Sequence, residues 1–159
     1  MNQEYIDKLI DKWGWGLVSI WCEMTAYIEQ DDDKKKIYLE KAKELQDKQS
    51  EIIKNTFTIA DYYGLDKQCN QTIEECGELI QALAKFNRVK GNGFDKPIKL
   101  GEAFEMIIEE IADVQICINQ LIYLTKRQYE INEITSSKLN RQIKRIDEEK
   151  TRSVENDKR

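Results

Sequence analysis

The fold is decided by a stretch at residues 73–88, which reads IEECGELIQALAKFNR. Its apolar residues recur every three or four positions, which is the period of an amphipathic helix. At about 100° per residue the three glutamates share one arc. The opposite arc holds the side chains that are expected to face the core: Ile73, Cys76, Ile80, Leu83 and Ala84. The stretch therefore predicts a helix, expected over residues 66–88, with an acidic face.

The same period continues on both sides of this helix and predicts further helices at residues 5–28, 32–63, 102–130 and 132–149. Capping or helix-breaking residues separate them. Asp31 to Asp33 precede the second helix and Gly64 follows it. A loop is expected at residues 89–101, because this segment holds Gly91, Gly93, Pro97 and Gly101.

Composition supports an all-α chain. Only seven glycines and one proline occur in 159 residues, and residues with good helix propensity dominate. The length suffices for one core but not for two large domains. We expect an all-α antiparallel helical bundle with three parts: an added N-terminal helical hairpin at residues 1–51, a main helical domain at 52–149 and a charged flexible tail at 150–159.

Charge and cysteine usage limit the partners and the compartment. A net charge of −5 argues against a nucleic-acid partner, because binding many phosphates needs a basic surface. The four cysteines show no CxxC spacing and no signal segment precedes them, so free thiols in a reducing cytoplasm are expected, and the localisation is expected to be cytoplasmic. Charged and amide side chains interrupt the longest apolar stretch, residues 107–124, which argues against a membrane partner. Histidine is absent, so Ser-His-Asp and Cys-His mechanisms are excluded.

Two carboxylates of the helix expected at residues 102–130 fall in an apolar stripe. Glu110 and Asp113 project onto the same side as Met106, Cys117, Leu121 and Leu124. Ionised carboxylates in such a stripe are costly unless they are protonated, paired with cations or bound to a metal. Lysines or arginines of another helix are the alternative partners. For the glutamates of residues 74–78, the alternative is an ordinary solvated acidic face.

Two packed helices that each offer carboxylates three residues apart can bring four oxygen ligands to one divalent cation. Mg²⁺ suits such a set, because it prefers oxygen ligands and keeps waters or phosphates in its remaining positions. Mn²⁺ is expected to substitute for it. Zinc would favour His or Cys ligands, and Cys76 and Cys117 form no spaced ligand set.

The acidic motifs and their surroundings resemble the MazG-like all-α NTP pyrophosphohydrolase superfamily, which has dUTPase-like and dCTPase-like relatives. The signature of this family is E-E-x-x-E followed, after a loop, by E-x-x-D. Here it reads Glu74-Glu75-x-x-Glu78 and Glu110-x-x-Asp113. The stretch at residues 73–88 and the sequence IEEIADVQI at 108–116 also share the hydrophobic register of the family. The resemblance covers about residues 52–146 and implies a MazG-like domain at 52–149.

The resemblance implies a magnesium-dependent hydrolase. Its metal ligands would be Glu75, Glu78, Glu110 and Asp113. Glu74 would assist as an extra ligand or as a base that positions water, so Glu74 and Glu75 are the expected catalytic residues. Family members cleave a nucleoside or deoxynucleoside triphosphate between its α and β phosphates, which yields a monophosphate and pyrophosphate. The implied role is cleaning of the nucleotide pool.

Cations for the outer phosphates are expected on the helix at residues 132–149. Four of its side chains fall on one face: Lys138, Arg141, Gln142 and Arg145. Some family members carry Lys-x-x-x-Asn-x-x-Arg here, and Gln142 departs from that pattern. Lys85 and Arg88 are further candidates. The alternative for the four-residue face is an ordinary solvated stripe.

Two other functions stay open. One is a non-enzymatic helical interaction module, in which the acids are salt-bridge partners and the Trp-rich segment with Trp13, Trp15 and Trp21 is the contact surface. The other is a hydrolase of another phosphorylated metabolite, of the phosphoribosyl-ATP type. The apolar helix at 102–130 predicts a homodimer or higher homo-oligomer, and residues 1–51 are expected to cover the site or build that dimer.

Overall fold

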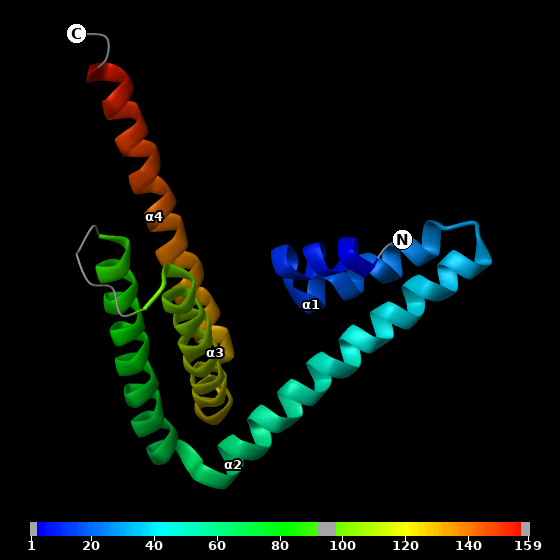
Figure 1. Ribbon diagram of the computed structural model, residues 1–159, viewed down its shortest axis with the longest axis horizontal. Coiled ribbons are helices and arrows are strands. Elements are labelled where there is room, and N and C mark those ends of the chain that lie inside the picture. The colour runs from blue at the N-terminus through cyan, green and yellow to red at the C-terminus, as the bar shows by residue number, and fades with distance from the viewer. Residues whose placement is uncertain (1–2, 92–97, 157–159) are drawn as a thin grey trace. The chain divides into compact units, whose positions relative to one another are not determined.

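The computed structural model describes residues 3–91 and 98–156, with side chains throughout these ranges except at residues 3, 4, 13 and 153–156. Every regular element in the described chain is a helix: α1 (Gln3–Ile28), α2 (Asp32–Lys90), α3 (Leu100–Thr125) and α4 (Gln128–Asn156) (Figure 1). The predicted all-α class is thus confirmed. Among the described residues, no helix is both long enough and apolar enough to cross a membrane.

Two glycines interrupt helices at backbone angles that other residues rarely adopt. Gly14 divides α1 (φ 76°, ψ 165°), and Gly64 divides α2 (φ 75°, ψ 174°). The break at Gly64 falls where the sequence predicts one. Asp31 caps the start of α2, because its Oδ1 accepts hydrogen bonds from the backbone N–H groups of Asp33 and Lys34, each at 3.1 Å.

Several predicted helix limits are wrong. The helix expected at residues 102–130 ends at Thr125, because Lys126 adopts a left-handed conformation (φ 56°) and its N–H donates to the Ile122 carbonyl. After this break α4 spans Gln128–Asn156, where the sequence predicts 132–149, so it includes part of the expected tail. The expected loop at 89–101 is also too long at both ends, and its Gly93 and Pro97 lie outside the described residues.

The chain divides into two compact units, Met1–Ile59 and Ala60–Arg159, where the sequence predicts a boundary after residue 51. In the first unit, the bend at Gly14 folds α1 back on itself, so that the ring centroids of Tyr5 and Trp21 lie 6.2 Å apart. The core of this unit consists of buried side chains from α1 and α2: Ile6, Leu9, Val18, Cys22, Ala42 and Leu45. Trp15 and Trp21 pack against this core, whereas the side chain of Trp13 lies outside the described part of the chain.

In the second unit, α2 beyond Gly64, α3 and α4 follow one another back and forth (Figure 1). The first two are antiparallel neighbours. Just before the break at Gly64, the Asp61 carboxylate of α2 accepts a hydrogen bond from the Tyr123 hydroxyl of α3 at 3.0 Å, near one end of the pair. Near the other end, the rings of Phe86 and Phe104 lie 6.1 Å apart. Both acidic motifs lie between these two contacts, on helices that face each other.

The side of α2 that packs in this unit differs from the predicted one. Ile73 and Ile80 are 72% and 67% exposed, and Leu83 and Ala84 are also exposed, so that only Cys76 of the expected core residues is half-buried. The packed stripe consists of other residues at helical spacing: Gln68, Thr72, Glu75, Leu79, Ala82, Phe86 and Val89. The expected core face is therefore wrong, and Glu75 lies inside the packed stripe.

Candidate metal centre

Carboxylates from α2 and α3 converge in the middle of this helix pair. One side-chain oxygen from each of Glu75, Glu110 and Asp113 lies within 4.8 Å of the other two, and all three residues are half-buried. Glu75 comes from the packed stripe of α2. The other two come from the predicted stripe of α3, whose remaining members are buried or half-buried: Met106, Cys117, Leu121 and Leu124. The fold thus brings together three of the four predicted metal ligands.

Glu110 is the acid whose environment is least favourable to its charge. Its Oε2 atom is buried and has no hydrogen-bond partner in the described chain. Burial raises the pKa of this carboxyl above its ordinary value, and the negative charges of Glu78, Asp113, Glu109 and Glu75 raise it further. A buried carboxylate oxygen is costly unless a proton, a hydrogen-bond donor such as water, or a cation satisfies it.

Glu75 accepts a hydrogen bond from an amide, and its charge acts on a nearby thiol. Gln71 Nε2 donates to Glu75 Oε1 at 2.5 Å. Burial raises the pKa of the Cys117 thiol, the charge of Glu75 raises it further, and a hydrogen bond with Thr72 lowers it. The converging ligand atoms are carboxylate oxygens, and no described cysteine belongs to the group.

The other two acids of the first motif lie at the margin of the site. Glu78 is exposed and does not belong to the three-carboxylate group, yet its charge is the largest influence after burial on the pKa of Glu110. Glu74 is exposed on α2. Neither side chain is brought into the group, and their predicted roles as ligand and as base stay predictions.

Most of the predicted phosphate-binding residues lie on α4, outside the helix pair that carries the acidic group. Lys138, Arg141, Gln142 and Arg145 are exposed on α4, and Lys85 is half-buried on α2. None of the salt bridges between described residues joins a lysine or arginine to Glu75, Glu110 or Asp113. Pairing of these half-buried acids with cations from another helix, the alternative to a metal, is therefore not observed in the described chain.

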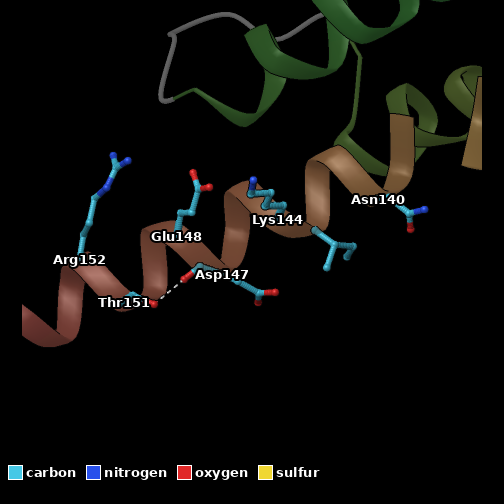
Figure 2. Close-up of a pocket in the computed structure, with 7 residues that line it drawn as sticks. Asn140, Lys144, Asp147, Glu148, Thr151 and Arg152 are labelled. Carbon is cyan, nitrogen blue, oxygen red and sulfur yellow. Dashed lines mark hydrogen bonds between the residues drawn. The ribbon is translucent and has the colours of Figure 1, made fainter. Parts of the chain in front are cut away.

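A hollow on α4 overlaps the same stretch of helix as these cations. It is lined by residues of α4 alone: Asn140, Ile143, Lys144, Asp147, Glu148, Thr151 and Arg152 (Figure 2). The Thr151 hydroxyl donates to the backbone carbonyl of Asp147 at 2.9 Å, and the side chains of Lys144, Glu148 and Arg152 extend from the same side of the helix (Figure 2). Ligand sites are usually concave and enclose most of the ligand, which one helix cannot do. The hollow is therefore no rival to the acidic group.

The acidic group fits a hard divalent cation. It offers oxygen donors only, it contains a buried carboxylate oxygen without a partner, and no described ion pair neutralises it. Mg²⁺ takes such ligands and leaves positions for water or phosphate. Glu75, Glu110 and Asp113 would hold the ion, and Glu78 is the further carboxylate whose charge acts most strongly on Glu110.

Two buried polar residues that were not predicted as site residues continue the seam between α2 and α3. Gln68 and Gln120 are both buried, and Gln68 Oε1 has no hydrogen-bond partner within the described residues. The spacing of Gln68, Thr72 and Glu75 was the available signal, because it is the helical spacing of one stripe.

No protein-family model, no curated protein and no solved structure matches this chain.

Proposed function

We propose that the protein is a Mg²⁺-dependent nucleoside triphosphate pyrophosphohydrolase, which converts a nucleoside or deoxynucleoside triphosphate and water into a monophosphate and pyrophosphate. One observation carries the proposal. Glu75, Glu110 and Asp113 converge from two facing helices, and Glu110 holds a buried oxygen without a partner. The two motifs that supply these residues are the motifs that resemble the MazG-like superfamily.

The chemistry needs a cation at the acidic group, since a triphosphate is repelled by bare carboxylates. Bound Mg²⁺ supplies charge neutralisation on the phosphate oxygens and a lowered pKa for bound water. The three converging carboxylates hold it. Glu78 is proposed as the fourth ligand, reached by rotation of its exposed side chain, and Glu74 as the group that orients the attacking water.

Cationic side chains are still required for the outer phosphates. Four of the predicted residues are exposed on α4, so their polar ends are accessible to a ligand: Lys138, Arg141, Gln142 and Arg145. We assign them, with Lys85, to binding the phosphates that leave as pyrophosphate. Placing positive charge on developing anionic oxygens stabilises the transition state more than the ground state.

Self-association is part of the proposal. Large apolar side chains of the second unit remain about half exposed or more on α2 and α3: Ile73, Ile80, Phe104, Ile108 and Ile111. Exposed apolar residues on this scale are typical of surfaces that bind a partner. We therefore propose a homodimer or higher homo-oligomer.

Calorimetry with Mg²⁺ and Mn²⁺ separates the enzyme from a non-enzymatic interaction module. We expect saturable binding that Asp113→Asn abolishes. Glu105→Gln is the matched control, because Glu105 is an exposed carboxylate on the same helix and lies outside the acidic group. A wild-type chain that binds neither metal would leave the interaction module as the better explanation.

The substrate is tested separately. Pyrophosphate release is measured with dUTP, dCTP, dTTP, ATP and phosphoribosyl-ATP. Turnover of one or more of the triphosphates supports the proposal, whereas turnover of phosphoribosyl-ATP alone assigns the site to the related hydrolase class.

A further inference from the structure

The first unit carries an apolar surface that is independent of the acidic group. Five side chains on the outer side of α1 form it and are 61%, 52%, 67%, 88% and 76% exposed, in this order: Leu17, Ile20, Met24, Tyr27 and Ile28. We propose that this surface, here called the α1 outer face, pairs with the same face of a second copy of this chain. The proposal names a surface for the self-association proposed above, and it does not depend on the acidic group or on its activity.

The spacing of the α1 outer face is that of a helix–helix seam. Leu17, Ile20, Met24 and Tyr27 follow one another at intervals of three, four and three residues, which is the a/d spacing of a heptad. The opposite side of the same helical segment is already used, because Val18, Cys22 and Ala26 are buried. This segment of α1 is therefore apolar on two sides, and only one of them has a partner within its own unit.

Charge distinguishes a second copy from other occupants. Residues 13–28 contain one charged side chain, Glu23, in a chain that is 35% charged. Its Oε1 accepts a hydrogen bond from Gln46 Nε2 of α2 at 2.6 Å, so this charge is held by the unit itself. A symmetric contact buries the same residues of both copies, so any charge on the face would lose its water twice, and a face without charges avoids that cost.

A membrane surface is a poorer match. Helices that lie on bilayers carry Lys or Arg on their polar side, and residues 13–28 contain neither. The charges that follow nearly cancel, Glu29 and Asp31 to Asp33 against Lys34 to Lys36, so they offer no basic patch to anionic lipid.

The size of the α1 outer face fits a small symmetric interface. Side chains of these types with these exposed fractions present on the order of 600 Å² per copy, and a standard interface buries about 800 Å² per partner. Residues at the rim would add to this area on pairing. The surface is thus large enough for a specific pair of copies.

Electrostatics favours an antiparallel arrangement. Parallel pairing would place the acidic segments at residues 29–33 of the two copies side by side. Antiparallel pairing separates them by more than about 20 Å along the helices, beyond the screening length of about 8 Å at physiological salt. In that arrangement Ile20 of one copy lies opposite Met24 of the other.

The test is the mass of the full-length protein in solution, measured by sedimentation across a range of concentrations. Ile20→Lys is expected to halve the mass of the wild-type assembly, whatever other surface also associates. The matched control is Ile37→Lys, because Ile37 is 49% exposed in the same unit and Ile20 is 52% exposed. An unchanged mass for Ile20→Lys, or a wild-type chain that stays at 18.8 kDa, would overturn the proposal.

Cross-linking provides an independent measurement. Chains with Ile20→Cys and chains with Met24→Cys, both also carrying Cys69→Ser to remove an exposed thiol, are mixed and treated with a short bismaleimide. Links between unlike chains support the antiparallel pair, and links mainly between like chains contradict it. A different pair of results would assign the face to membranes instead. In that case the wild-type chain is monomeric and floats with phosphatidylcholine vesicles, and Met24→Lys abolishes the flotation.

Discussion

Replacing Glu110 with glutamine should change the stability of the second unit in opposite directions with and without metal. Without metal, the folded-state pKa of Glu110 lies above its unfolded value, so the folded chain binds the proton more tightly. The metal-free protein therefore loses stability as pH rises from the unfolded pKa through the folded pKa. Glu110→Gln removes that loss and should be the more stable protein at neutral pH when metal is absent.

With metal the order should reverse. A ligand that binds only the folded state at 100 times its dissociation constant adds about 2.7 kcal/mol. The second unit spans Ala60–Arg159, about 100 residues, for which an unfolding entropy of about 2.1 cal/mol/K per residue applies. The melting temperature of the wild type should then rise by roughly 13 °C at that concentration, because the stabilisation of about 2.7 kcal/mol is divided by an entropy of about 0.2 kcal/mol/K. The variant, which lacks one carboxylate ligand, should shift by much less.

The assay is thermal unfolding followed by circular dichroism in EDTA and in excess Mg²⁺. All three tryptophans lie in the first unit, so their fluorescence follows that unit separately. Glu105→Gln is the matched control and should behave as the wild type in both conditions. A metal shift in Glu110→Gln equal to that of the wild type, or a less stable variant in EDTA, would refute the role of Glu110 as a ligand held under charge repulsion.

Four further predictions concern other parts of the chain. Mg²⁺ affinity should fall between pH 8 and pH 5, because the raised pKa of Glu110 lets protons compete with the metal for its carboxylate. Calorimetry that finds equal affinities at the two pH values would count against the acidic group. Gly14→Ala should destabilise the first unit by about 1–3 kcal/mol in urea unfolding followed by tryptophan fluorescence. A Cβ at this position meets no atom within 4 Å, so the cost is not a clash but backbone strain at φ 76°. An unchanged stability would exclude that strain. Gln68→Leu should stabilise the second unit by about 1 kcal/mol, because it removes the buried acceptor Gln68 Oε1, which has no partner among the described residues. A loss of stability in chemical denaturation would indicate that this acceptor is satisfied. Hydrogen bonds from Lys48 and Lys41 lower the pKa of Glu44 to about 2. The stability that this carboxylate contributes above its unfolded pKa should therefore be lost as pH falls from about 4.5 to about 2, by no more than about 1 kcal/mol at this exposed site. Glu44→Gln should flatten this part of a pH titration of stability.

The helical class and the break at Gly64 could be predicted because both depend on local sequence. Glycine and proline are scarce along the chain, and Gly64 adopts a φ of 75° that favours glycine. The end of α3 at Thr125 could not be predicted in the same way. It depends on a left-handed conformation at Lys126, and lysine carries no local preference for that conformation.

The packed side of α2 was mispredicted because burial is decided by the neighbouring helix rather than by hydropathy alone. Ile73 and Ile80 are more apolar than Thr72 and Glu75, yet the isoleucines are the exposed pair. For α3 the same reasoning succeeded, because the carboxylates at Glu110 and Asp113 interrupt a stripe whose other members are apolar. For α2, the prediction of Glu75 as a metal ligand rested on the motif alone. That Glu75 lies in the packed stripe, facing α3, follows only from the fold.

The most direct test of the central claim is the identity of the products formed from deoxynucleoside triphosphates. Phosphorus NMR of a reaction with Mg²⁺ should show a nucleoside monophosphate and pyrophosphate in equal amounts, with no signal from Asp113→Asn under the same conditions. A diphosphate with inorganic phosphate, or no product from any triphosphate in the panel, would contradict the assignment of Glu75, Glu110 and Asp113 to a pyrophosphohydrolase site.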